Sequence, residues 1–145
     1  MTPDLPAVSE VTVRVNYRET DQMGVVYHAR YLVWLDIARC EHLRRTGVTY
    51  ADLEARGLRL AVGDLRIRYR QPARYDDLIR VRCWVRECVS RRVTFGYAVE
   101  CPDRAELLAT AETAMMVLGA DLGLARLPAD VAALLPAIPD PIRLF

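Results

Sequence analysis

Residues 31–47 form the stretch that most limits what this chain can fold into. They predict one long helix, which starts at Tyr31 and stops at Gly47, a residue suited to the left-handed turn past a last helical turn. Its apolar residues cover most of the helix circumference, and they are Leu32, Trp34, Leu35, Ile37, Ala38 and Leu43. Such a helix is usually surrounded by other structure. The rest of the chain must therefore supply a broad apolar surface.

Alternating apolar and polar residues supply that surface, because this pattern is typical of half-buried strands. The predicted strands are 11–17, 65–70, 79–86, 92–99 and 107–118. Short turns join the later ones, which favours an antiparallel sheet with one apolar face and one arginine-rich face. A long curved sheet of this kind, wrapped around one central helix, gives an α+β fold. Its open edge strands favour pairing with a second copy of the chain.

The segments around the sheet are predicted from local signals. Residues 1–9 are expected to be a loose arm. The pair Thr49 and Asp52 resembles a capping box that opens a second helix over 50–56, which Gly57 ends. A short closing helix is expected within 127–135, with proline in its first turn, followed by an extended proline-rich tail from 136 to 141.

Composition excludes several functions. The 145 residues predict one domain, 52% hydrophobic and 27% charged, and the formal net charge of +1 gives no general attraction to nucleic acid or anionic membrane. All 20 basic residues are arginine, which excludes lysine Schiff-base chemistry. The four cysteines lack metal-ligand spacing and are expected to be reduced thiols of a cytoplasmic protein. We expect no signal peptide, and no stretch approaches the roughly 20 apolar residues that span a bilayer.

The loop between the first strand and the long helix carries the candidate chemistry. It spans 17–31 and reads YRETDQMGVVYHARY, which includes one of the two histidines. Loops of this length in compact domains are often functional. The first N–H groups of a helix lack helical partners, so the helix start can stabilise developing negative charge. Asp21 on the same loop could attack a substrate or deprotonate water beside that positive end.

This loop resembles the signature of the 4-hydroxybenzoyl-CoA thioesterase family, which has the hotdog fold, and particularly its bacterial acyl-CoA thioesterase branch associated with the Tol–Pal system. The run YRQPARYDD at 69–77 is similar to the family's turn between two strands. The likeness covers about 11–118. It implies a single hotdog thioesterase domain over 1–145, with the core at about 11–118 and the closing helix and proline-rich tail at 127–145.

The resemblance also implies site residues. Asp21 stands at the position of the catalytic carboxylate, and His28 stands where a helix-start N–H polarises the thioester carbonyl. The oxyanion and substrate positions are Gly24, Val26, Tyr27 and Tyr31. Arg91, together with Arg92, falls where some members bind the phosphates of CoA. Glu19 replaces an aspartate common at its position, and we assign it no catalytic role.

The implied function is hydrolysis of an acyl-CoA thioester to free acid and CoA. Asp21 is either the base or the nucleophile, and no metal or cofactor beyond the CoA of the substrate is expected. We expect a homodimer or homotetramer with the site at the subunit interface, no nucleic-acid partner and no membrane span. The alternatives are a hotdog dehydratase and a non-catalytic module that binds acyl-CoA or acyl-carrier protein.

Simpler structural roles compete with these assignments. Asp21 could be a turn aspartate that bonds its own backbone beside Gly24. The His28 ring could merely pack or orient Asp21, and His42 is expected to be structural. The tyrosines of the loop could be plain core.

Overall fold

The computed structural model describes residues 5–145, so the first four residues of the predicted arm at 1–9 lie outside the described residues. One five-stranded antiparallel sheet, in the order β1-β3-β4-β5-β2, spans the molecule. Its strands are β1 Ser9–Arg14, β2 Arg59–Tyr69, β3 Leu78–Val89, β4 Arg92–Cys101 and β5 Glu106–Leu118. The helices are α1 Tyr31–Arg44, α2 Tyr50–Ala55 and α3 Ala129–Ala132, with 3-10 turns η1 Tyr17–Glu19, η2 His28–Arg30 and η3 Pro102–Arg104.

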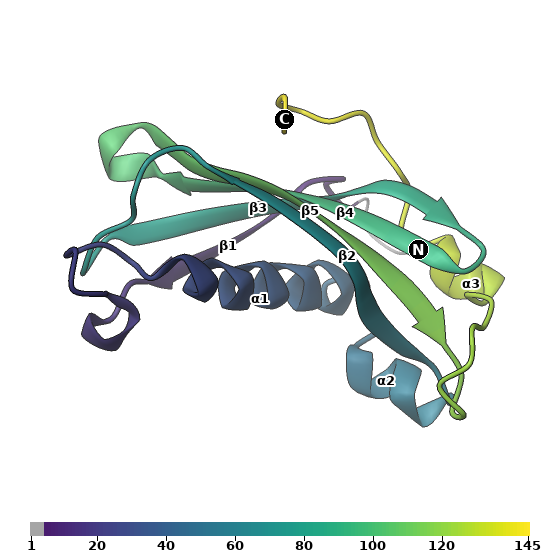
Figure 1. Ribbon diagram of the computed structural model, residues 1–145. Coiled ribbons are helices and arrows are strands. Elements are labelled where there is room, and N and C mark those ends of the chain that lie inside the picture. Colours follow the sequence, from purple (N-terminus) through teal and green to yellow (C-terminus); the bar gives the residue numbers. More distant parts are fainter. Residues whose placement is uncertain (1–4) are drawn as a thin grey trace.

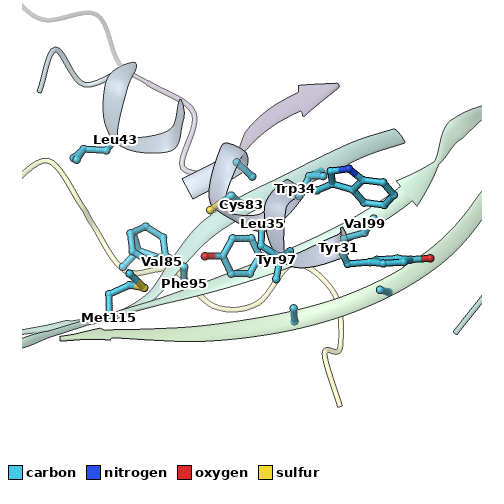
Figure 2. Packing of buried hydrophobic residues seen from close by; sticks show 14 of the residues in the cluster. Tyr31, Trp34, Leu35, Leu43, Cys83, Val85, Phe95, Tyr97, Val99 and Met115 are labelled. Carbon is cyan, nitrogen blue, oxygen red and sulfur yellow. The ribbon is translucent and has the colours of Figure 1, made fainter. Parts of the chain in front are cut away.

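The predicted α+β class, with a curved antiparallel sheet around one long helix, is confirmed (Figure 1). Helix α1 lies along the concave face, where Tyr31 and Trp34 lie beside Val99 of β4 and Leu35 lies beside Tyr97 (Figure 2). These five side chains are each at most 2% exposed. Burial of large apolar side chains of this kind contributes about 1.5–3 kcal/mol each.

The sheet of one chain covers only one side of α1. On the other side Leu32, Val33 and Ile37 are 37%, 49% and 37% exposed, although the apolar pattern predicted a helix enclosed all round. Five strands curve around part of the helix circumference, which leaves these apolar side chains exposed.

Several element boundaries differ from the sequence prediction. Strand β2 begins at Arg59, whereas the predicted strand begins at 65. The prediction missed residues 59–64 because a register shift between Val62 and Asp64 interrupts the alternation that marks a strand. The predicted capping box of α2 is confirmed, since Asp52 N–H donates to Thr49 Oγ1 at 3.1 Å and Thr49 N–H donates to Asp52 Oδ2 at 2.8 Å. Gly57 follows with a φ of +79°, as a helix stop requires.

The arginine-rich outer face is ion-paired and partly covered. Arg80 and Arg82 both contact Glu100, and Arg86 contacts Glu112. The tail after α3 then crosses this face (Figure 1), with the N–H of Ile138 donating to the carbonyl of Val85. The predicted extended tail is thus a docked segment.

Three residues of this tail, Asp140, Leu144 and Phe145, contact the outer face. Trp84 Nε1 donates to Asp140 Oδ1 at 2.9 Å, and Arg86 forms an ion pair with the same carboxylate. The carbonyl of Leu144 accepts from Thr110 and Arg70. The Arg66 guanidinium lies 3.9 Å from the ring centroid of Phe145. The tail therefore shields the tryptophan on this face from solvent.

Two basic side chains of α1 lie inside the fold. Arg39 is 6% exposed and donates to the hydroxyls of Tyr50 and Tyr97, at 3.0 and 3.3 Å. His42 is 2% exposed, with Nδ1 2.6 Å from Ser9 Oγ, so its predicted structural role is confirmed. Burial keeps the imidazole neutral, because it lowers the pKa of His42 to about 4.

Candidate active site

The loop that carries Asp21 is a tight hairpin in front of α1. Thr20 and Val26 form an isolated antiparallel bridge, and Asp21 N–H donates to the carbonyl of Val25 at 2.9 Å. The turn closes when Gly24 N–H donates to the carbonyl of Asp21 at 3.0 Å, with Gly24 at a φ of +78°. Glycine suits this position because other residues rarely adopt that conformation.

The Asp21 carboxylate is half-buried at the start of the hairpin. Its Oδ1 accepts a hydrogen bond from the N–H of Met23 at 2.8 Å, which is the local bond of a turn aspartate. Its Oδ2 accepts no hydrogen bond from the described residues. Asp21 therefore has the turn-stabilising role that competes with a catalytic one, while its Oδ2 remains available for chemistry.

The start of the helix leaves donors unpaired. The N–H of Val26 donates to the carbonyl of Ala73 at 2.8 Å, and the N–H of Tyr27 donates to the carbonyl of Glu19 at 2.9 Å. Within residues 5–145, the N–H groups of His28 and Ala29 donate to no acceptor. Neither η2 nor α1 has a side-chain cap. These two amides are thus open to a ligand, as expected at the start of a helix.

A cavity of about 270 Å³ opens at the helix start, with His28 in its lining. Three predicted site residues line it, namely Val26, His28 and Tyr31. The sequence prediction missed the others, which come from the end of β2 and the following turn; they are Tyr69, Arg70, Gln71 and Pro72, with Val25 completing the wall. The only sequence signal for these residues was the similarity of 69–77 to the family's turn between two strands. That similarity did not indicate that the turn lies against the loop at 17–31.

Tyrosines shape the cavity wall. Tyr31 is 2% exposed, and its hydroxyl accepts a hydrogen bond from the N–H of Ala73 at 3.0 Å. Burial raises the pKa of Tyr31, although this hydrogen bond opposes the change. Tyr69 packs edge-on against Tyr31, with ring centroids 5.1 Å apart, and its hydroxyl donates to the carbonyl of His28 at 2.7 Å. Burial also raises the pKa of Tyr69, so both phenols stay protonated at neutral pH.

Glu19 links the hairpin to the core. Its carboxylate is buried and accepts hydrogen bonds from Asn16 N–H at 2.9 Å and from Trp34 Nε1 at 3.1 Å. Trp34 lies on the buried side of α1, so Glu19 joins the chain before the hairpin to the helix after it. This buried carboxylate has a structural role that the sequence pattern did not indicate.

The remaining predicted residues lie outside the cavity. Asp21 and Gly24 form the adjoining hairpin, and the ring of the exposed Tyr27 lies tilted against the His28 ring, with centroids 4.5 Å apart. Arg91 and Arg92 lie at the exposed β3–β4 hairpin, where Arg92 forms an ion pair with Glu87 at 2.6 Å.

A larger hollow of about 740 Å³ lies on the outer face, where Arg66, Arg86 and Arg92 alternate with acidic side chains. Two of these arginines are bound to the carboxylates that line the same hollow, Arg86 to Glu112 and Arg92 to Glu87. The smaller cavity, next to unpaired amides, is therefore the candidate site.

Two further features of the described residues bear on the site. The part of the chain that the structure describes contains no group of three or more His, Cys, Asp or Glu side chains placed to hold a metal ion. None of its helices has both the length and the apolar character needed to cross a bilayer.

Comparisons with known proteins show the family and the fold. Residues 15–135 match the model of the thioesterase-like superfamily. A Bacillus subtilis protein, provisionally named acyl-CoA thioesterase YneP, is 37% identical over 95 residues, which is 66% of this chain and 69% of that protein. The acyl-CoA thioesterase YbgC of Haemophilus influenzae is 43% identical over 57% of this chain and 62% of its own length.

Two solved structures share the fold at substantial identity. A hypothetical protein from Thermus thermophilus superimposes with a TM-score of 0.82 at 38% identity, over 88% of this chain and 96% of that one. The DHNA-CoA thioesterase of Staphylococcus aureus superimposes with a TM-score of 0.79 at 30% identity, over 82% and 80% of the two chains.

Proposed function

Because the chain belongs to the thioesterase-like superfamily, we propose that it is an acyl-CoA thioesterase that hydrolyses an acyl-CoA to the free acid and CoA. The observation that carries the proposal is the pair of unpaired N–H groups, on His28 and Ala29, beside a cavity and next to the hairpin of Asp21. The finer placement in the 4-hydroxybenzoyl-CoA thioesterase family and its Tol–Pal-associated branch, as one hotdog domain over 1–145, is part of the proposal.

The proposed mechanism needs two contributions. Hydrogen-bond donors aimed at a developing oxyanion are each worth about 10²–10³ in turnover, and we assign this role to the amides of His28 and Ala29. A positioned base or nucleophile adds about 10²–10⁴, and we assign it to the free Oδ2 of Asp21. The amides of Val26 and Tyr27 are excluded as donors because both are already bound.

Substrate contacts follow from the same arrangement. We assign the acyl group to the cavity lined by Val26 and Tyr31. Gly24 and Tyr27 lie outside this cavity, and we propose that they contact the substrate next to the thioester.

Arg91 and Arg92 lie at the opposite end of the sheet from Tyr69, so we assign the CoA phosphates to these two arginines of a second copy of the chain. Arg92 would have to leave its ion pair with Glu87. Exposed surface ion pairs typically contribute less than about 1 kcal/mol, so breaking the pair of Arg92 with Glu87 costs little free energy.

A second copy of the chain is proposed to complete the site. Strand β2 pairs with β5 on one side, and its other edge has no partner among the described residues. Val62 and Leu65 on β2 are 51% and 39% exposed, and they add to the exposed apolar side chains of α1. Pairing through the β2 edge would cover both surfaces. Because Tyr69 ends β2 and lines the cavity, the site would then lie at the interface.

The activity is tested by thiol release from a panel of short, long and aromatic acyl-CoAs, followed with DTNB. Wild type is expected to turn over, and Asp21→Asn to lose about 10² or more in kcat with a smaller change in KM. Asp76→Asn is the matched control, because Asp76 is an exposed turn aspartate with a φ of +67°, which asparagine tolerates.

The outcomes separate the alternatives. Equal activity of Asp21→Asn and wild type would remove Asp21 from the mechanism. Acyl-CoA binding without thiol release would favour a binding module, and hydration of an enoyl-CoA would favour a dehydratase.

The oligomer is tested by light scattering on a sizing column. Wild type is expected at two or four times 16.5 kDa, and Leu65→Arg at a lower mass with reduced turnover. A fully active monomeric wild type would contradict the shared site.

A further inference from the structure

We propose that Tyr69 is a positioning residue of the thioesterase site, because its hydroxyl holds the His28 carbonyl and so sets the direction of the open amides at the helix start. The inference rests on the proposed function. Tyr69 lies outside the loop at 17–31: it ends β2 and opens the run 69–77 that is similar to the family's strand-to-strand turn.

The contacts of Tyr69 join the sheet to the helix start. Its backbone is paired with Ala109 of β5, which is fully buried, so the residue is anchored on a rigid element. Its hydroxyl reaches the His28 carbonyl at 2.7 Å, and its ring meets the rings of Tyr31 and His28 edge-on, with centroids 5.1 and 6.3 Å apart. Tyr69 thereby holds the first turn of the helix from a strand of the sheet.

The helix start is unusual in how it is held. A helix normally begins with Ser, Thr, Asp or Asn, whose side chain accepts one of the first N–H groups. Here the residues before α1 are Tyr27, His28, Ala29 and Arg30, and no side chain caps either η2 or α1. A conventional cap would occupy a donor that the substrate needs. Tyr69 instead bonds a carbonyl of the first turn, which stabilises the turn and leaves the donors free.

The planarity of the peptide bond connects this contact to the chemistry. The His28 carbonyl and the Ala29 N–H belong to one trans peptide unit and point in opposite directions. The hydroxyl that fixes the carbonyl therefore also fixes the Ala29 N–H, which points away from Tyr69 toward the open end of the helix. Correctly aimed donors lower the barrier because they bind the transition state more strongly than the ground state.

The test compares Tyr69→Phe with wild type in hydrolysis of hexanoyl-CoA and benzoyl-CoA. Phenylalanine keeps the ring contacts and removes only the hydroxyl. We expect kcat to fall about tenfold with KM changed less than about twofold, since the effect appears in the transition state. Tyr75→Phe is the matched control, because Tyr75 is 56% exposed, its ring lies edge-on to that of Tyr17, and it does not line the cavity.

A spectroscopic readout separates positioning from general structural support. The carbonyl stretch of benzoyl-CoA bound to Asp21→Asn should shift to lower frequency, as donors polarise it. The shift should shrink in Asp21→Asn/Tyr69→Phe at saturating ligand. If Tyr69→Phe does not fold, 3,5-difluorotyrosine can replace Tyr69 instead. This residue keeps the hydroxyl but ionises at a lower pH than tyrosine. Activity should then fall at a lower pH than in wild type as the pH is raised.

The outcomes are distinct. The role of Tyr69 would be overturned if wild type hydrolyses acyl-CoA and Tyr69→Phe leaves both kcat and the carbonyl shift unchanged. An alkaline pH profile that does not move with difluorotyrosine would overturn it too. In both cases the proposed function would stand. Absence of thiol release by wild type from every acyl-CoA would overturn the proposed function, and the role of Tyr69 with it.

Discussion

Trp34 Nε1 on helix α1 donates a hydrogen bond at 3.1 Å to the buried carboxylate of Glu19, fifteen residues earlier in the chain. The other oxygen of that carboxylate accepts the N–H of Asn16 at 2.9 Å. One buried side chain thus connects the end of the first strand, the hairpin of Asp21 and the central helix. The candidate site depends on a group that takes no part in the proposed reaction.

Replacing Glu19 with Gln should lower the free energy of unfolding by about 1–3 kcal/mol. The glutamine amide keeps one acceptor oxygen, so one of the two donors, Asn16 N–H or Trp34 Nε1, loses its partner. Urea unfolding measures the change. Glu10→Gln, at an exposed position of β1, is the control and should change stability by less than about 0.5 kcal/mol.

A double-mutant cycle of Glu19→Ala, which removes both acceptor oxygens, with Trp34→Phe isolates the contact. The two substitutions should be non-additive by about 1 kcal/mol, because either one alone already breaks the hydrogen bond. Strict additivity would show that the bond between Glu19 and Trp34 does not contribute to stability.

Acidification should destabilise the protein through His42. Burial, with added repulsion from Arg45, lowers the pKa of His42 to about 4 in the folded state, against about 6.5 in an unfolded chain. Between these values the unfolded state binds the extra proton, so the free energy of unfolding falls as the pH falls, by at most about 1.4 kcal/mol per pH unit. The groups that face the ring are Ser9, Arg45 and Phe95, together with the carbonyl of Cys83.

Urea unfolding of wild type and His42→Gln at pH 7.5, 6.0 and 4.5 measures this contribution. The glutamine variant should be less stable at pH 7.5, since it loses a well-packed ring, but its stability should fall less steeply toward pH 4.5. Parallel pH profiles for the two proteins would assign the acid sensitivity to other groups.

Adding a methyl group at position 96 should disturb the outer face. A Cβ at Gly96 would lie 2.6 Å from Cε2 of the Trp84 indole, which is fully buried under the tail. Overpacking of this kind typically costs about 1–3 kcal/mol. Thermal unfolding of Gly96→Ala should therefore show a lower Tm, and the same substitution in a Trp84→Leu background should cost much less. An equal cost in both backgrounds would mean that the indole is not the obstacle.

Asp140 should hold the tail against the sheet. Its carboxylate accepts from Trp84 Nε1 and pairs with Arg86, so Asp140→Ala should cost about 1–2 kcal/mol and expose the indole. Fluorescence emission should shift to longer wavelength, with faster quenching by acrylamide. Asp103→Ala, at an exposed turn position, should leave the spectrum unchanged. An unshifted spectrum in Asp140→Ala would show that the tail stays docked without this contact.

Local signals predicted the elements of the fold well. The capping box at Thr49, the stop at Gly57 and the alternation in β3 to β5 each depend on neighbours in sequence, and each is confirmed. The early part of β2 was missed because a bulge near Val62 breaks the two-residue period that a strand requires.

Long-range contacts explain what the sequence could not predict. Tyr69 reaches His28 across 41 residues, and Arg39 is buried because hydroxyls of Tyr50 and Tyr97 meet its guanidinium. Such pairings depend on the register of the sheet and on the rotation of α1, which no local pattern encodes. The loop at 17–31 could be found from sequence, whereas the cavity wall from Tyr69 to Pro72 required the fold.

The docked tail also decides how the molecule can be attached to a support. The tail ends with the Phe145 ring over Arg66, on the outer face of the sheet, while α1 and its first turn lie on the concave side (Figure 1). A surface linkage or a fluorescent reporter fused after Phe145 would therefore emerge behind the sheet. Immobilised in that orientation, the protein would present the helix start and its cavity to the solution.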